Sequence, residues 1–172
     1  PELLNHLSLS ELECEFRTQV ETVIATGLKP THLDSHCHIH IRRKDIFEMT
    51  SSLSKEYGIA LRVGSREFID SIRKQGFPTD DHSTLDSYRL ETRDKPVLYP
   101  KLLRELPPGL SEWAIHPGIG DEELKSIMPD WEVRQADFDF FTSKEAREIV
   151  EEENINIISY RPLLDAWERI RY

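Results

Sequence analysis

The chain has 172 residues, a length that suits one domain with a sizeable core, and its 38% hydrophobic and 31% charged residues are ordinary for a soluble protein. Its net charge of −10 disfavours nucleic acid as a partner, because phosphate backbones are bound by basic surfaces. No apolar run approaches the roughly 20 residues that span a bilayer, and two cysteines cannot form a disulfide framework. We therefore expect a single cytoplasmic domain over residues 1–172, with no membrane span.

Helical and strand patterns alternate along the first half of the chain. Ser10 and Glu13 read as a capping box for a helix that ends at Gly27. The elements expected after it are, in order, a strand over 30–40, a helix over 44–58, a short buried strand over 59–63 and a helix over 65–76.

The second half opens with a long irregular stretch, 77–96, which is rich in Asp, Ser and Thr. The elements expected after it are a helix over 97–105, a strand over 111–116, a short helix capped by Asp121, a helix over 132–140, a helix from a Thr142–Glu145 capping box to 153, a strand over 155–160 and a helix that begins at Pro162. Strands that alternate with helices predict an α/β fold with parallel strands and right-handed crossovers. An open sheet and about half of an eight-stranded (β/α) barrel both fit this pattern.

The segment 30–40 holds most of the candidate metal ligands. Alternate side chains of a strand share a face. If the segment stays extended throughout, one face therefore carries five possible metal-ligand donors, namely His32, Asp34, His36, His38 and His40. Neutral imidazole and carboxylate groups suit a Zn²⁺-like ion, so this face predicts a metal site. The alternative is a polar strand end whose histidines bond to the backbone. Cys37 would point to the other face as a packed thiol.

A second candidate residue, His116, ends the strand over 111–116, just before Pro117-Gly118. Because Pro and Gly force an abrupt turn, they hold the imidazole at the carboxyl end of a strand, where chemistry gathers in α/β folds. A histidine in this position suits general acid or base catalysis near neutral pH. The alternative is a histidine that is satisfied by its own turn.

Three further places carry charged side chains of useful type. Asp81 and His82, in the long irregular stretch, could bind a ligand or belong to a solvated loop. Arg62, at the end of the second strand, could bind a substrate oxygen or pair with a carboxylate, and Arg134 presents the same choice.

These residues together resemble a known family. The segment 30–40 (PTHLDSHCHIH) and the segment 111–118 (SEWAIHPG) are similar to two signatures of the YdjC-like (ChbG/HpnK) carbohydrate deacetylases, and Asp81-His82 resembles their Asp-His loop motif. Arg62 and Arg134 are similar to arginines of that family. The order and approximate spacing agree over about residues 10–161.

The resemblance implies a distorted, TIM-like (β/α) barrel and hydrolysis of the acetamide of N-acetylated mono- or oligosaccharides, with release of acetate. It implies a divalent metal, Zn²⁺ or Mg²⁺, with His36 or His38 as a ligand. Asp34 would orient a ligand by contacting it, without binding the metal itself. His116 would protonate the leaving amine, and the substrate would contact Arg62, Asp81, His82 and Arg134. It leaves a homodimer open.

One departure from the family pattern is decisive. The family's Asp-Asp motif, which supplies the catalytic base, and a further histidine ligand precede the stretch that matches here, and neither is present. We therefore expect residues 1–172 to be the C-terminal part of a larger deacetylase barrel, inactive by itself. Two alternatives are an amidohydrolase-type metal enzyme, whose opening strand Asp34–His38 resembles, and a non-catalytic carbohydrate-binding remnant.

Overall fold

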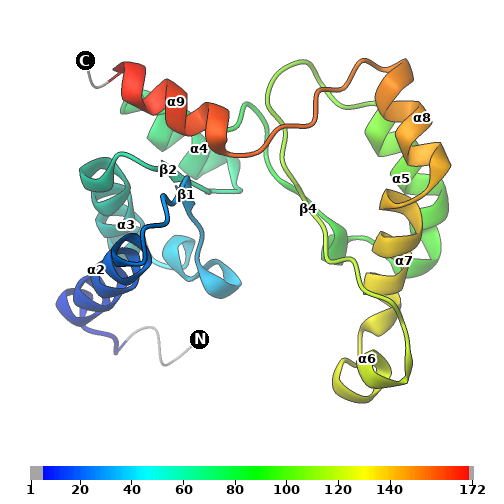
Figure 1. Cartoon of the computed structure of the whole chain (residues 1–172), viewed down its shortest axis with the longest axis horizontal. Coiled ribbons are helices and arrows are strands. Elements are labelled where there is room, and N and C mark those ends of the chain that lie inside the picture. The colour runs from blue at the N-terminus through cyan, green and yellow to red at the C-terminus, as the bar shows by residue number, and fades with distance from the viewer. Residues whose placement is uncertain (1–5, 171–172) are drawn as a thin grey trace. The chain divides into compact units, whose positions relative to one another are not determined.

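The computed structural model of the chain describes residues 6–170, without the side chains of Trp167, Glu168 and Ile170 (Figure 1). The described residues fall into two compact units. One unit contains the residues up to Thr79 together with those from Ile158, and the other contains Asp80–Ile157. The expected assignment of 1–172 to a single domain stays a prediction, and each unit is described by itself.

Among the residues that the structure describes, the first unit joins four α-helices to one pair of short parallel strands. Its elements are α2 (Leu9–Ala25), β1 (His32–Leu33), the 3₁₀ helix η1 (His36–Ile41), α3 (Lys44–Tyr57), β2 (Ala60–Leu61), α4 (Arg66–Lys74) and α9 (Arg161–Ile170). β1 and β2 are parallel, with His32 opposite Ala60 and Leu33 opposite Leu61. Because both residues of β2 are buried, the strand pair lies in the interior of this unit.

Apolar side chains from α3, β2 and α4 form the core of the first unit. Its buried members include Ile46, Phe47, Leu53, Ile69 and Ile72. The helical spacing of these residues gives α3 and α4 one apolar face each. Burial of such side chains stabilises the unit by about 1.5–3 kcal/mol each.

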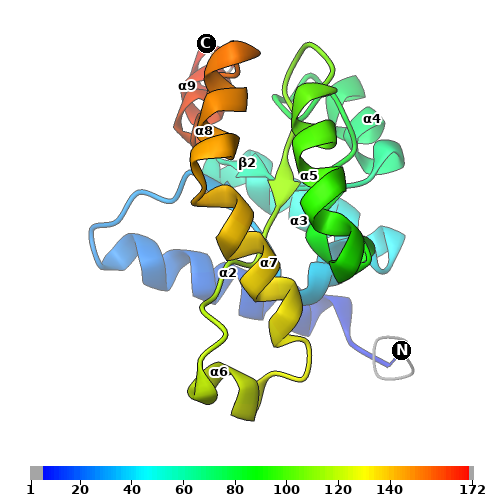
Figure 2. The same cartoon turned by 90° about the vertical axis from the view of Figure 1, so that its right-hand side faces the viewer.

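The second unit packs three helices beside another parallel strand pair. Its elements are β3 (Leu85–Asp86), η2 (Ser87–Arg89), η3 (Thr92–Asp94), α5 (Lys95–Arg104), β4 (Trp113–Ala114), α6 (Glu122–Ile127), α7 (Trp131–Phe141) and α8 (Lys144–Glu152). Figure 2 shows α5 alongside α7 and α8, and the three helices contact one another. β3 and β4 are parallel, with Leu85 opposite Trp113.

Aromatic rings fill the core of the second unit. Tyr99 is fully buried, and the rings of Trp113 and Phe141 lie edge-on to each other at 5.1 Å between centroids. Trp113 also meets Tyr99 edge-on at 5.2 Å. Such edge-to-face contacts add about 0.5–1.5 kcal/mol each beyond burial. They attach β4 to α5 and α7, and so fix the strand that leads into His116.

The helix caps confirm one prediction and shift two others. Asp121 caps α6 as predicted, since its carboxylate accepts a hydrogen bond from the Leu124 N–H at 2.9 Å. α2 is capped by Ser8 and not by Ser10, and α8 by Ser143 and not by Thr142. Neighbouring Ser and Thr residues offer the same acceptor, so the sequence pattern locates a cap only to within a residue or two.

The predicted strand over 155–160 is wrong. Within residues 6–170 this segment forms no strand, and the Ile157 and Ile158 side chains are 81% and 50% exposed. The β-branched residues favour an extended chain, but a strand also needs a neighbour whose backbone groups it can pair with. A strand that was not predicted, β3, lies in the Asp- and Ser-rich stretch, where only two residues pair.

The α/β character of the prediction is confirmed, because the described strands are parallel and helices separate them in sequence. They form two separate pairs and not one continuous sheet. Among residues 6–170 no helix has the length and apolar character needed to cross a membrane.

Candidate functional site

The histidine-rich segment does not stay extended, so the predicted single face of five donors is wrong. The strand ends at Leu33, and His36–Ile41 form the 3₁₀ helix η1. Within it Cys37 and His38 have φ angles of 52° and 55°, in the left-handed region that residues other than glycine seldom adopt. This change of direction also exposes Cys37, which was predicted to be a packed thiol.

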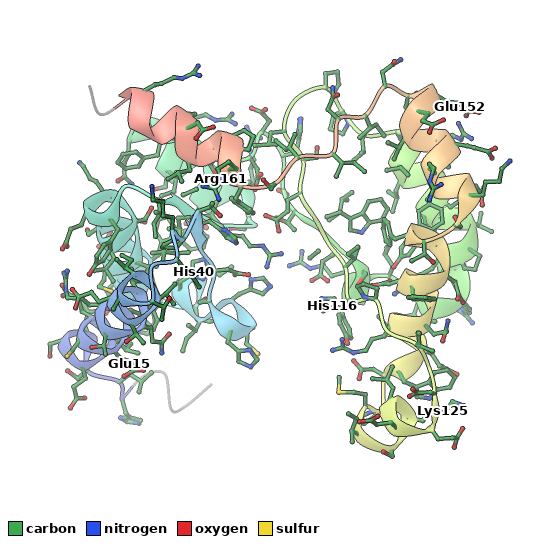
Figure 3. All side chains as sticks on the ribbon, in the orientation of Figure 1. Glu15, His40, His116, Lys125, Glu152 and Arg161 are labelled. Carbon is green, nitrogen blue, oxygen red and sulfur yellow. The ribbon has the colours of Figure 1, made fainter. Side chains whose placement is uncertain are left out.

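His40, which Figure 3 labels, is a buried residue with 1% exposure. Both of its ring nitrogens are hydrogen-bonded. Nε2 lies 2.6 Å from the Arg62 carbonyl oxygen, and because a carbonyl only accepts, Nε2 carries the proton. Nδ1 then accepts from the Ser35 hydroxyl at 2.5 Å. Burial lowers the pKa of His40, which is therefore neutral. Its nitrogens bind protein groups, so it holds η1 against β2.

His32 also has a structural partner. Its ring stacks on Tyr160 with the ring centroids 3.9 Å apart and the planes 11° from parallel. Its Nδ1 lies 3.0 Å from the Thr31 hydroxyl. This histidine therefore joins β1 to the segment that leads into α9.

His36 and His38 are the two predicted metal ligands. His36 is exposed and His38 is half-buried. Within the described part of the chain, no three or more His, Cys, Asp or Glu side chains gather where they could hold a metal ion. Two imidazoles have the right donor chemistry for Zn²⁺, but a protein site usually supplies at least three ligands. Their role as ligands stays a prediction.

Asp34 and Arg62 form an ion pair, in which Arg62 Nη1 donates to Asp34 Oδ2 at 2.9 Å. The Arg62 N–H also donates to the Leu33 carbonyl at 3.0 Å, which extends the pairing of β1 and β2. Of the two interpretations of Arg62, the structure shows the carboxylate partner. Contact of Arg62 with substrate, and orientation of a metal ligand by Asp34, stay predictions.

The segment His116–Gly120 is attached to α7 by three backbone donors. The His116 N–H donates to Asp137 Oδ2 at 2.7 Å, and the Gly118 N–H donates to the Arg134 carbonyl at 3.1 Å. The Gly120 N–H donates to Gln135 Oε1 at 2.5 Å. Alternate residues of the segment thus bind acceptors within about one turn of α7, and this holds the backbone of His116, which Figure 3 labels, at a fixed place after β4.

The approach of this segment to α7 depends on Gly120. A Cβ atom there would lie 2.6 Å from Trp131 Cε3 and 2.8 Å from its Cζ3. Real Cβ atoms do not come so close to a ring, so a larger residue would push the segment away from the helix. The glycine therefore supports the position of His116 from four residues away.

The imidazole of His116 contacts the ring of Tyr88 and not its own turn. The two rings meet nearly edge-on, with 4.6 Å between centroids and 72° between planes. Among the described residues no group hydrogen-bonds to either ring nitrogen of His116, so the alternative of a histidine satisfied by its own turn does not hold. Among these residues, both nitrogens are therefore left for a ligand.

Charged groups surround the Tyr88 side of this histidine. Interaction with the Tyr88 hydroxyl, and then the charges of Arg134 and His116, lower the pKa of Asp130. Burial and the neighbouring Asp130 raise the pKa of Tyr88. Arg134 therefore lies within electrostatic range of Asp130 and Tyr88, and its contact with substrate stays a prediction.

A buried ionised group lies directly behind His116. The Asp137 side chain is 0% exposed, and its Oδ1 accepts from Lys95 Nζ at 3.0 Å and from the Tyr99 hydroxyl. Burial opposes ionisation of Asp137, but the hydrogen bonds from Tyr99, His116 and Lys95 outweigh it and lower the pKa of the carboxyl. The same burial, with the negative Asp137 beside it, raises the pKa of Tyr99.

Sequence reasoning missed Asp137, Lys95 and Tyr99. One signal was present: Val133, Asp137 and Phe140 share the core-facing side of a helix, and an acid at such a position needs a buried partner. The partners lie on α5, about 40 positions earlier, and no local pattern points to them.

Asp81 and His82 fasten the turn that precedes β4. Asp81 Oδ2 accepts from the Leu110 N–H at 2.7 Å, and His82 Nε2 donates to the Pro108 carbonyl at 3.0 Å. Between these contacts Gly109 has a φ of 115°, and a Cβ there would lie 2.7 Å from Asp81 Oδ2. The pair therefore positions backbone, and its contact with substrate stays a prediction.

Residues 2–152 match the family described as YdjC-like protein. The chain belongs to this family. A carbohydrate deacetylase of Clostridium beijerinckii is 27% identical over 90% of this chain, and one of Enterococcus faecalis is 26% identical over 91% of it. A crystal structure of an Enterococcus faecalis protein, described as a candidate cellobiose-phosphate cleavage protein, superposes with a TM-score of 0.71 at 26% identity. That structure is matched over 92% of this chain.

The match covers only part of each relative. The chain spans 62% of the two deacetylases and 62% of the solved structure. The YdjC-like relationship predicted from the two signature segments is confirmed.

Proposed function

We propose that this chain supplies part of the active site of a carbohydrate deacetylase, which hydrolyses the acetamide of an N-acetylated sugar and releases acetate. The observation that carries the proposal is the attachment of His116 to α7, with both ring nitrogens free, in a chain of the YdjC-like family. Relatives named carbohydrate deacetylase support the reaction class and favour it over an amidohydrolase.

His116 has the role of general acid in this proposal. Amide hydrolysis expels an amine, which is a poor leaving group until it gains a proton. An imidazole can donate that proton, provided that its distance to the leaving nitrogen is fixed. The backbone contact with Asp137 and the ring contact with Tyr88 restrict this distance.

A divalent ion, Zn²⁺ or Mg²⁺, is the proposed cofactor, and His36 and His38 are its proposed ligands in this chain. When bound, such an ion polarises the amide carbonyl as a Lewis acid. The imidazole donors suit it, and His36 is exposed while His38 is half-buried. We place the remaining ligands and the catalytic base outside these 172 residues, and we propose that both strand pairs belong to one TIM-like (β/α) barrel of the intact gene product.

The first test is the intact mass of the natural gene product. A mass well above 20.1 kDa, with an Asp-Asp strand ahead of residue 1, supports the deacetylase proposal. A mass near 20.1 kDa would mean that the base is absent, and a carbohydrate-binding remnant would then be the better interpretation.

The second test uses that gene product with N-acetylglucosamine oligomers. We expect metal in the purified protein and release of acetate. His116→Ala should lower turnover and leave the metal content unchanged, whereas His36→Ala or His38→Ala should lower both. A complete protein that bound no metal and released no acetate would refute the proposal.

A further inference from the structure

We propose that Asp137 is a positioning residue for His116, which it holds through the main-chain N–H and not through the imidazole. The effect of this contact on catalysis rests on the proposed function, whereas the contact itself can be tested without any reaction.

The hydrogen bond from the His116 N–H to Asp137 Oδ2 is 2.7 Å long, which is short for a nitrogen donor and typical of a charged acceptor. It connects His116, two residues after β4, to the middle of α7, 21 positions further along the chain. The neighbouring bond, from the Gly118 N–H to the Arg134 carbonyl, lies one helical turn earlier. Two points separated by one turn of a rigid helix fix both the place and the direction of the His116 backbone.

Lys95 and Tyr99 determine which oxygen is left for His116. Both bind Oδ1, on the side of α5, so Oδ2 remains for the backbone donor. All of these groups are buried, with Lys95 1% exposed and Tyr99 and Asp137 0% exposed, so water does not compete for the oxygens. The α5–α7 contact therefore orients the carboxylate, and the carboxylate orients the segment that carries His116.

An amide cannot make this arrangement. If the oxygen of an asparagine at position 137 faces His116, its NH₂ faces the two donors Lys95 and Tyr99. If the oxygen faces α5, the NH₂ faces the His116 N–H instead. Asp137→Asn therefore breaks one side of the network in either orientation, although it changes the size of the side chain very little.

The direct test is NMR of the 172-residue chain labelled with ¹⁵N and ¹³C. We expect a through-hydrogen-bond coupling between the His116 amide nitrogen and the Asp137 carboxylate carbon, and slow hydrogen exchange at that amide. If the chain is folded and the coupling is absent, the proposal is overturned. Because this measurement uses the unmodified chain, it stands even if a variant fails to fold.

The catalytic test compares Asp137→Asn with Glu132→Gln in the intact gene product. Glu132 lies on the same helix and is exposed, so the control makes the same carboxylate-to-amide change away from the network. A small displacement of a catalytic group costs up to about a hundredfold, so we expect kcat of Asp137→Asn to fall by about ten- to a hundredfold with KM nearly unchanged. Glu132→Gln should keep both constants.

Lys95→Met separates positioning from general stability. It removes a partner of Asp137 that does not contact His116, while Tyr99 still binds Oδ1 and leaves Oδ2 for the backbone donor. It should therefore lower the melting temperature while the His116 amide coupling and most of kcat remain. If Lys95→Met and Asp137→Asn lowered kcat equally and the coupling survived in both, the network would act only on stability, and the proposal would be wrong. If the unmodified gene product released no acetate, the proposed function would fail, and the coupling would still decide the positioning role.

Discussion

The two histidine-bearing segments, His32–Ile41 in the first unit and His116–Gly120 in the second, present opposite designs. In the first, His32 and His40 use their rings to hold local structure, and Asp34 is paired with Arg62. In the second, the backbone of His116 carries the hydrogen bonds and its imidazole contacts only the ring of Tyr88 among the described residues. A histidine-rich segment can therefore be mostly structural, because its rings bond to neighbouring protein groups.

The burial of charge sharpens this comparison. Asp137, behind His116, is ionised and shielded from water, whereas the Asp34–Arg62 pair in the first unit has an Asp34 side chain that is 37% exposed. Exposed pairs contribute little to stability, while removal of one member of a buried pair leaves an uncompensated charge. The second unit should therefore be the more sensitive of the two to charge mutations.

The largest effect is expected from Lys95→Met. Removing one partner of a buried ion pair lowers the free energy of unfolding by about 3–5 kcal/mol, because Asp137 stays charged and loses its cation. Urea unfolding followed by tryptophan fluorescence measures this. Lys144→Met, which breaks the exposed Lys144–Glu148 pair, should cost less than about 1 kcal/mol. Equal losses in the two variants would show that burial of the pair is unimportant.

His40→Ala should destabilise the first unit by about 2–3 kcal/mol, because it opens a cavity and leaves the Arg62 carbonyl without its donor. His36→Ala, at an exposed ring, should stay within about 0.5 kcal/mol of the unmodified chain. Chemical unfolding of the two variants measures both. If His36 proved the more important for stability, the structural role assigned to His40 would be wrong.

Gly120→Ala should cost about 1–3 kcal/mol, since the added methyl group overlaps the Trp131 ring and the segment must move. Gly27→Ala is the control for backbone strain, because Gly27 has a φ of 87° and nothing within 4 Å of the added atom. Only Gly120→Ala should also shift the His116 amide resonance. An unchanged His116 resonance would contradict the close attachment of this segment to α7.

The smallest effect is expected from lowering the pH. The contribution of Asp137 to the pH dependence of the free energy of unfolding comes only from the difference between its pKa values in the folded and unfolded chain. The pKa of Asp137 is lower in the folded chain than in the unfolded chain. The ionised carboxylate therefore stabilises the fold fully at pH values above the unfolded-state pKa, and this stabilisation is lost as the pH falls through the folded-state pKa. The free energy of unfolding should therefore fall more steeply with acid in the unmodified chain than in Asp137→Asn. Urea titrations from neutral pH to about 3 compare the slopes, and equal slopes would exclude this contribution.

The sequence by itself determined the family, the order of the helices and the position of His116 after a strand. These features depend on local signals: apolar spacing for α3 and α4, an Asp cap for α6, and Pro-Gly after His116. The alternation in 30–40 and 155–160 was equally clear, yet the first segment turned into η1 after two strand residues and the second paired with nothing within residues 6–170.

Only the tertiary structure decided which polar side chains are structural. That His40 bonds the Arg62 carbonyl, and that Asp81 bonds the Leu110 amide, follows from contacts 22 and 29 positions apart in sequence. The same holds for Lys95 and Tyr99, which reach Asp137 from another helix. A hydrogen bond depends on distance and direction in space, and a sequence pattern records neither for residues on different elements.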